Sequence, residues 1–241
     1  MNKMPLAILA LVLATMACTK TEESTPTPEH PAAESVPKSG GFDLVGAETD
    51  ISFLIVSNSA GPITGRFPNG VSGSLDASGK GSVAIQLDTM KSLDKNDAEN
   101  PLRDANVVEA FFGVRPSALL PEPVDKAWAA IADKLERSVA TARFDISATE
   151  GLDAATGSMT GNLVLWNKVS IPLTFAVTVT RSGDRLELAS SAPASFDLEE
   201  VMGADLRKLT FDTMLAAGCA HQPGIQNKVE ITLHKVVLNA K

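Results

Sequence analysis

The chain has 241 residues and a formal net charge of −8, with 21 Lys and Arg residues against 29 Asp and Glu residues. Binding to nucleic acid or to anionic lipid headgroups needs clustered basic side chains, which this sequence lacks, so both are excluded as partners of the folded surface. Two cysteines, Cys18 and Cys219, do not make a disulfide framework. The fold must therefore be stabilised by burial of apolar side chains.

Residues 1–17 have the layout of a secretory signal peptide: an early lysine, then an apolar run too short for a membrane span. The end of this segment resembles the bacterial lipobox, although Thr15 stands where that motif usually has leucine. The resemblance implies cleavage before Cys18 and its acylation, for example with palmitate. Thr19, not Asp, follows, which predicts an outer-membrane lipoprotein facing the periplasm. The alternative is cleavage near Ala17 and a soluble periplasmic protein.

Residues 18–41 predict a disordered linker between the lipidated cysteine and the rest of the chain. The stretch "TKTEESTPTPEHPAAESVPKSGG" holds many Pro, Ser, Thr and Glu residues and almost no large apolar side chains. Such a composition buries too little surface to offset the entropy of ordering. Residues 42–241 remain, which is enough for one domain with a sizeable core.

From residue 42 onward, apolar and polar side chains alternate with a period of two. The clearest case is "VSIPLTFAVTVT", residues 169–180, in which every second residue from Ile171 is apolar. Successive side chains of a strand point to opposite faces, so this segment predicts a strand with one buried face. Pro172 cannot donate a hydrogen bond to a neighbouring strand, which places it at an edge or a bulge.

The same alternation recurs in seven more segments with turn sequences between them. These segments are "ISFLI", "VSGSLD", "VAIQLD", "RFDIS", "GNLVLW", "RLELA" and "VEITL". Many alternating strands joined by short turns, with few helices, are typical of an antiparallel sandwich or barrel.

Two segments depart from the strand pattern and predict helices. Asp104 begins a short run with apolar residues at helical spacing, for which it is a candidate N-cap. Residues 121–140 have the pattern of an amphipathic helix that packs Trp128 against the barrel. Stacking of Trp128 on a cofactor is the alternative. The pair Arg103–Asp104 is interpreted as a structural ion pair or cap at a corner of the chain.

With these segments in place, the chain resembles the YceI family of periplasmic lipid-binding proteins. The resemblance rests on "ETDISFLI", "ITGRFPNGVSGSLD", "LRDANVVEAFFGVRP", "ARFDIS", "GNLVLWNKVSIPLTFAV" and "VEITLHKVVL". Residues 115–141 look like a helical insertion. Glu48–Thr49 stand at the family's early His–Ser pair, and Asn106 stands where its histidine follows Arg–Asp.

The resemblance implies an all-β fold, an extended lipocalin-like antiparallel barrel of about eight strands with one or two short inserted helices. It also implies an elongated apolar pocket for polyisoprenoid chains. The ligand-facing residues expected on this basis are Phe53, Phe67, Val71, Leu75, Phe111, Phe112, Phe144, Leu163, Leu165, Leu173 and Phe175.

Gly73 and Gly161 have the same parity as inward-facing residues of their strands. Two missing inward side chains would leave a channel inside the barrel. The alternative is that these glycines relieve curvature where the sheet closes. The family resemblance favours the channel.

No set of residues for catalysis can be assembled, so an enzyme is not expected. The three histidines are His30 in the linker, His221 in a predicted loop and His234 on the polar side of the last strand. Cys219 and His221 are weak candidates for a soft metal ion, but two ligands are too few. An unpaired, sheltered cysteine is the alternative. No resident cofactor is expected.

The leading hypothesis is a lipid-anchored protein that sequesters or transports an isoprenoid, either a polyprenyl chain or a quinone. Its partners would be that apolar lipid and the membrane that holds the N-terminal anchor. The rival hypothesis is a ligand-free structural or partner-binding lipoprotein with a packed barrel. The oligomeric state stays open, with a dimer among the options.

Overall fold

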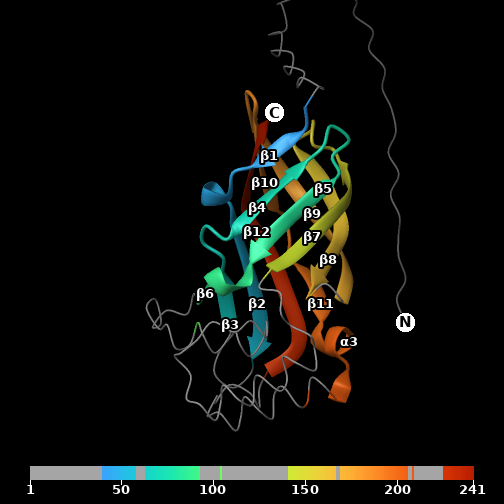
Figure 1. Ribbon diagram of the computed structural model, residues 1–241. Helices are drawn as coiled ribbons and strands as arrows, with labels where there is room; N and C mark the ends of the chain where they lie inside the picture. The colour runs from blue at the N-terminus through green and yellow to red at the C-terminus, as the bar shows by residue number, and fades with distance from the viewer. Residues whose placement is uncertain are drawn as a thin grey trace, which may run out of the picture. The chain divides into compact units, whose positions relative to one another are not determined.

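The computed structural model describes residues 40–57, 63–92, 104, 141–166, 169–205, 208 and 225–241. These belong to one compact unit, Ser35–Lys241, and form an antiparallel β-barrel (Figure 1). Its elements in chain order are β1 (Phe42–Leu44), η1 (Gly46–Glu48), β2 (Asp50–Ser57), β3 (Ile63–Arg66), β4 (Val71–Leu75), β5 (Gly81–Gln86), η2 (Leu87–Thr89), β6 (Lys91–Ser92), β7 (Thr141–Glu150), β8 (Thr156–Leu165), β9 (Val169–Ser182), β10 (Arg185–Ser190), β11 (Ala194–Asp197), α3 (Leu198–Met202) and β12 (Ile225–Ala240).

The barrel closes through eight strands in the order β1-β4-β5-β7-β8-β9-β10-β12, because β12 pairs back with β1. The closing register joins Phe42 to Ala240 and Leu44 to Leu238. A sheet that closes on itself leaves no exposed edge over the closed part. The predicted lipocalin-like antiparallel barrel is therefore confirmed.

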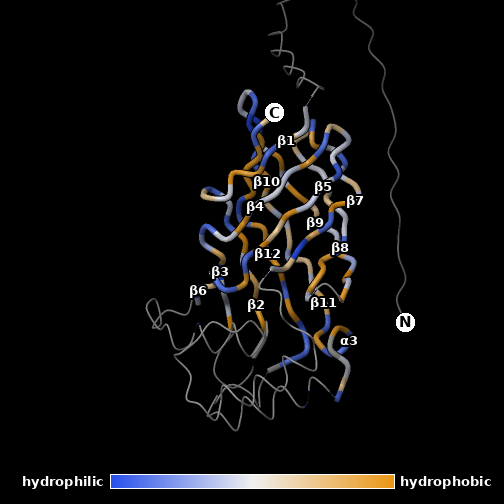
Figure 2. The backbone as a smooth tube through the Cα atoms, viewed as in Figure 1, coloured by the Kyte–Doolittle hydropathy of each residue, from blue (hydrophilic) through white to orange (hydrophobic). Residues whose placement is uncertain are grey.

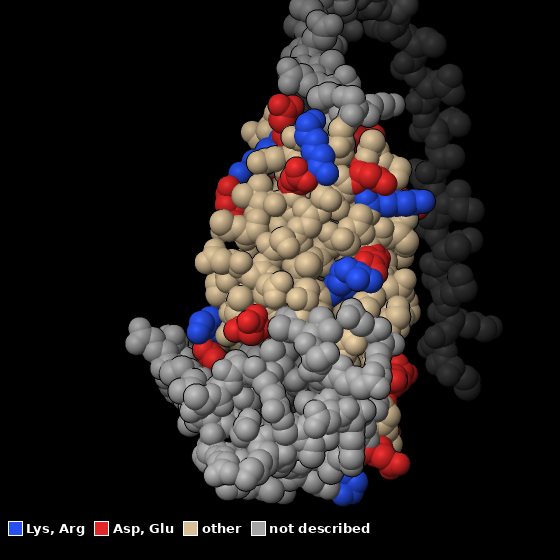
Figure 3. All heavy atoms as spheres, viewed as in Figure 1, with Lys and Arg blue, Asp and Glu red and all other residues tan. Residues whose placement is uncertain are grey.

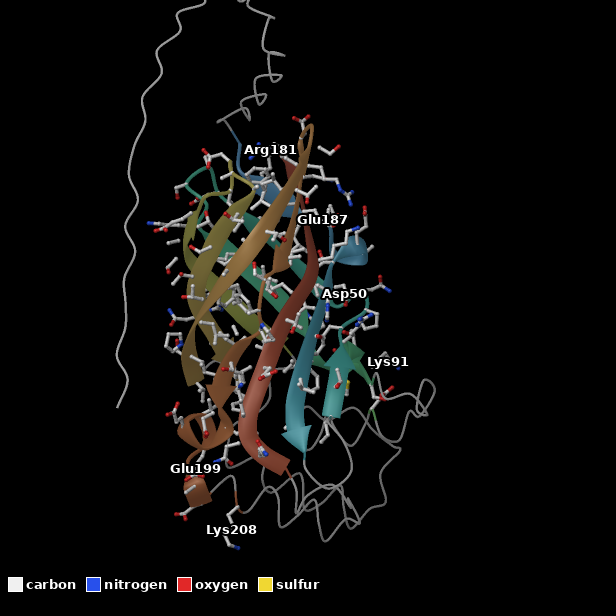
Figure 4. All side chains as sticks on the ribbon, turned by 180° about the vertical axis from the view of Figure 1, so that it is seen from behind. Asp50, Lys91, Arg181, Glu187, Glu199 and Lys208 are labelled. Atoms are coloured by element: carbon white, nitrogen blue, oxygen red, sulfur yellow. The ribbon has the colours of Figure 1, made fainter. Side chains whose placement is uncertain are left out.

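Strand β12 belongs to both ends of the barrel. Its second half pairs with β1 and β10, and its first half pairs with β2 and β11. Strands β3 and β6 extend the sheet beyond β2. Figure 4 shows β12 beside β2 from behind. We call the end with β1 and the β9–β10 turn the β1 end, and the end with α3 and β6 the α3 end (Figure 1).

A bulge in β12 changes which of its residues face inward. The register with β2 shifts between Leu233 and Lys235. Before the shift the buried residues of β12 include Val229 and Leu233, and after it Val236 and Leu238 continue the core. An extra residue in one strand moves the alternation by one place. The bulge therefore keeps the apolar side chains in both halves of β12 facing the core.

The predicted alternation is confirmed along the strands. All eight predicted segments overlap strands of the barrel: β2, β4, β5, β7, β8, β9, β10 and β12. In β9, the residues of one face are buried from Ile171 to Val177, and the residues between them are exposed. Figure 2 shows the same alternation of hydrophobic and hydrophilic positions along the tube. Strands β1, β3, β6 and β11 were not predicted, since they are too short for a clear period.

Pro172 lies at an exposed position of β9. Within the described residues, the first half of β9 forms a ladder only with β8, whereas β10 pairs with Val177–Ser182. This placement agrees with the edge position predicted for the proline.

The two inward glycines do not form a channel, contrary to the favoured interpretation. A Cβ atom at Gly161 would lie 2.2 Å from the carbonyl oxygen of Asp145, and one at Gly73 would lie 2.2 Å from that of Ser82. The ladder between β7 and β8 has a bulge between Ile146 and Ala148, beside Gly161. Both glycines therefore permit close approach of neighbouring strands, which is the curvature alternative.

Ion pairs lie on the outside of the barrel near its β1 end. Arg185 on β10 hydrogen-bonds the carboxylate of Glu48, and this bond holds the pKa of Glu48 below its usual value. Lys241 lies 3.0 Å from Asp43. Such exposed pairs contribute little to stability. Glu48, which stands at the histidine position of the YceI resemblance, therefore forms a surface ion pair with Arg185.

Thr49, which stands at the serine position of the same resemblance, is buried and joins η1 to β12. Its hydroxyl donates a hydrogen bond to the Val45 carbonyl and accepts one from the Val237 amide. Val237 faces outward but is fully buried under this turn.

Within the described part of the chain, no helix has the length and apolar character that crossing a membrane requires. The predicted signal peptide, nearly all of the linker, the helix at 121–140 and the insertion at 115–141 other than residue 141 lie outside the described residues.

The close approach at Gly161 predicts a stability effect. Gly161→Ala should lower the free energy of unfolding by about 1–3 kcal/mol, because its methyl group would overlap the β7 backbone. Gly183→Asn is the matched control: the turn there has φ +57°, open space around it, and a conformation that asparagine tolerates. Denaturant unfolding measures both variants, and equal stability of the two would contradict the steric argument.

Candidate functional site

The α3 end of the barrel contains an apolar cavity of about 60 Å³, and the space between its lining atoms together with its opening to solvent is about 650 Å³. Among the described residues, no Lys, Arg, Asp or Glu lines it, and charged atoms are seen instead on the outer surface (Figure 3). The lining residues are Ile51, Ser52, Phe53, Ile55, Phe67, Ile85, Leu87, Ala142, Leu163, Leu165, Trp166, Phe196, Leu198, Val201, Val229 and Ile231.

One wall of the cavity comes from β2 and the first half of β12. The register places Phe53 opposite Ile231 and Ile55 opposite Val229. Directly opposed residues of an antiparallel pair share one face of the sheet. These pairs therefore form a continuous apolar surface inside the barrel.

Phe53 and Phe67 form an aromatic corner next to this wall, with ring centroids 5.8 Å apart. The corner needs a glycine on β3: a Cβ atom at Gly65 would lie 2.5 Å from the Phe53 ring. The "GRF" sequence thus serves two purposes. Gly65 makes room for one ring, and Phe67 packs against that ring.

The opposite wall comes from β5, β7 and β8. Ile85 pairs with Ala142 across β5 and β7, and Leu163 and Leu165 are buried inward residues of β8. Ala142 is the smallest side chain of this wall, so it leaves space that a larger residue would fill.

Trp166 follows Leu165 at the end of β8, and both side chains line the cavity. Consecutive residues of a regular strand point to opposite faces, so the tryptophan would normally face outward. Its φ of +55° changes the direction of the chain at this point. The left-handed conformation costs a bulky residue about 1 kcal/mol or more, and it brings the indole, only 4% exposed, inside.

A third side of the cavity comes from β11 and α3. The carboxylate of Asp197 accepts hydrogen bonds from the backbone N–H groups of Glu199 and Glu200, at 2.7 and 3.3 Å. This N-cap starts the helix directly after β11. Leu198 and Val201, three residues apart on α3, then face the cavity together.

Ser52 is the only one of the described lining residues without an apolar side chain. Its Oγ atom lies 2.7 Å from Nε2 of His234, on the neighbouring strand β12. The serine is buried, and this contact satisfies its hydroxyl group. The sequence did not predict the pair, since its members are 182 residues apart.

Four of the predicted ligand-facing residues line the cavity: Phe53, Phe67, Leu163 and Leu165. Five others are buried in the core but do not line it: Val71, Leu75, Phe144, Leu173 and Phe175. Phe111 and Phe112 lie outside the described residues, as do Cys18, Cys219 and His221.

Some lining residues that were not predicted had a signal in the sequence. Ile51, Ile55, Ile85, Val229 and Ile231 continue the inward parity of their strands. Trp166, Phe196, Leu198 and Val201 had no such signal. Trp166 faces the cavity because of its positive φ. Phe196 lies on the short strand β11, and Leu198 and Val201 lie on the capped helix α3.

Asp104 has the structural contacts expected for a corner residue. Its carboxylate accepts a hydrogen bond of 2.8 Å from the Ser92 amide and lies 3.5 Å from the Lys91 ammonium group. Both partners belong to β6. The Arg103 half of the pair lies outside the described residues.

Among the residues that the structure describes, no group of three or more His, Cys, Asp or Glu side chains is arranged to hold a metal ion. The weak metal candidates Cys219 and His221 are not part of this set.

No protein-family model and no curated protein matches the sequence. Solved structures do match. A polyisoprenoid-binding domain from Saccharophagus degradans aligns with 84% of this chain and 99% of its own, at 12% identity and a TM-score of 0.57. Burkholderia cenocepacia BcnA aligns with 83% of this chain and 100% of its own, at 16% identity and a TM-score of 0.50. At these identities the likeness establishes the fold, and it confirms at that level the resemblance to the YceI family.

Trp166 provides a direct probe of the cavity. In a Trp128→Phe variant it is the only tryptophan, and its fluorescence should be quenched by a long-chain alcohol that carries bromine atoms along its chain. Quenching needs near contact, which the lining position of the indole provides. Binding of this alcohol by calorimetry without any quenching would show that the chain binds elsewhere.

Proposed function

We propose that the chain binds an apolar isoprenoid-type lipid, a polyprenyl chain or the tail of a quinone, in the cavity at the α3 end. The observation that carries this proposal is the lining itself: aliphatic and aromatic side chains on three sides, and no charged group among the lining residues that the structure describes. Ligand pockets of proteins are predominantly apolar with few polar groups. The described part of this lining has a single polar side chain, Ser52, which already has a partner.

Burial of a hydrocarbon chain supplies enough free energy for binding without any polar contact. At about 25 cal/mol per Å² of apolar surface, a long prenyl tail gains on the order of 10 kcal/mol before the cost of immobilisation. The polar head of a quinone would lose hydrogen bonds to water inside such a cavity. We therefore expect the head group to stay outside and the tail to enter.

The structural comparison supports the same class of ligand. The domain from Saccharophagus degradans, which shares this fold, is described as polyisoprenoid-binding. The cavity also favours the lipid carrier over the rival hypothesis of a partner-binding protein with a packed barrel. That rival needs a filled interior throughout, whereas the α3 end contains open space.

The setting that we propose for this activity is the bacterial cell envelope. Cleavage before Cys18 and acylation would anchor the protein to the outer membrane on its periplasmic side, with residues 18–41 as a tether. The protein would then sequester or transport the lipid without a resident cofactor and without catalysing a reaction.

The ligand is tested by organic extraction and mass spectrometry of the purified protein. The native protein should release an isoprenoid lipid, and Ala142→Leu should release much less, because the larger side chain fills the cavity. Ala84→Leu is the matched control, since Ala84 lies on the outer face of β5, opposite Arg143. A native protein that carries no lipid and takes up no prenyl chain would refute the proposal.

The anchor is tested by growing cells with radiolabelled palmitate. The native protein should incorporate label, Cys18→Ser should not, and Cys219→Ser should behave as native. Secretion of an unlabelled native protein would instead support cleavage near Ala17 and a soluble periplasmic protein.

A further inference from the structure

On four strands of the barrel the lining of the cavity ends partway along the strand. On each strand the last lining residue is followed, toward the β1 end, by an inward position that does not line the cavity. The pairs of last lining residue and next inward residue are Ile85 and Val83 on β5, Ala142 and Phe144 on β7, Leu163 and Gly161 on β8, and Ile231 and Leu233 on β12.

Two phenylalanines occupy the interior farther toward the β1 end. Phe144 and Phe175 make an edge-to-face contact, with centroids 5.5 Å apart and ring planes at 89°. Both are buried. Phe144 lies directly opposite Leu163, a lining residue, so the ring pair borders the cavity.

Gly161 explains why the two rings meet. Strand β8 lies between β7, which carries Phe144, and β9, which carries Phe175. Along β8, Leu163 lies opposite Phe144 and Met159 lies opposite Phe175, so the inward position between them is Gly161. Because this glycine has no side chain, it places nothing between the two rings on the inner face of β8.

We propose that the Phe144–Phe175 pair, packed behind the lining residues, forms the floor that closes the cavity toward the β1 end and sets the length of hydrocarbon chain that the protein holds. This inference rests on the proposed function and adds to it the size class of the ligand. A chain that enters the cavity stops at the lining residues in front of the rings. Any carbon atoms beyond this length stay outside the apolar lining and gain no burial.

This floor predicts a break in affinity as the ligand is lengthened. Each isoprene unit that is buried should strengthen binding about tenfold or more, because apolar area removed from water drives association. Once the cavity is full, a further unit should change the affinity little. The test uses linear prenyl alcohols of increasing length, from geraniol through farnesol and geranylgeraniol to longer members, with affinity measured by titration calorimetry.

Phe175→Ala removes a ring about the size of one isoprene unit from the floor. The break should therefore move to a longer alcohol by at least one unit, and Phe144→Ala should have a similar effect. If either alanine variant does not fold, Phe175→Leu and Phe144→Leu open the floor less and keep the test possible. These variants should bind the next longer alcohol more tightly than the native protein does.

Leu186→Ala is the matched control. Leu186 is a fully buried residue near the β1 end, paired with Leu238, and does not line the cavity. It should leave the break unchanged while it loosens the core. An unchanged break in both phenylalanine variants, or the same shift in Leu186→Ala, would overturn the floor alone. A native protein that binds no prenyl alcohol of any length would overturn the proposed function together with it.

Discussion

Strand β12 is the constraint on which the rest of the barrel depends, because it pairs with four other strands. Near the β1 end it joins β1 to β10 and closes the sheet, and near the α3 end it joins β2 to β11. The bulge between Leu233 and Lys235 separates these two functions. A strand of uniform parity would turn Val236 and Leu238 away from the core in its second half. The position of one extra residue therefore determines whether both ends of the barrel have an apolar interior.

The barrel is divided into a packed end and a hollow end, and the same residue types build both. On the β1 side of the cavity the aromatic pair Phe144–Phe175 fills the interior. Near the α3 end the wall contains Ala142, and helix α3 contributes short apolar side chains from one side. Interiors pack to high density wherever side chains can reach each other. Space is left only where the facing residues are too small or too far apart to meet.

A site of this kind has almost no chemical motif in the sequence, because hydrocarbon ligands need apolar area and shape instead of charged or hydrogen-bonding groups. The polar contacts near the cavity are structural. Ser52 binds His234, Asp197 caps α3, and Asp104 binds the start of β6. Each of them orients a part of the wall or of the nearby backbone. The polar residues therefore position the cavity, and the apolar residues form it.

The alternation of residue types along the sequence determined the fold class and most of the inward-facing residues, since successive side chains of a strand point to opposite faces. Its inward positions include Phe53, Leu163 and Leu165, which line the cavity. Only the tertiary structure decided that Phe144 and Phe175 fill space and that Trp166 faces inward. The alternation along a strand specifies only to which face of the sheet each side chain points. Whether an inward side chain leaves room depends on which rings from other strands reach the same place.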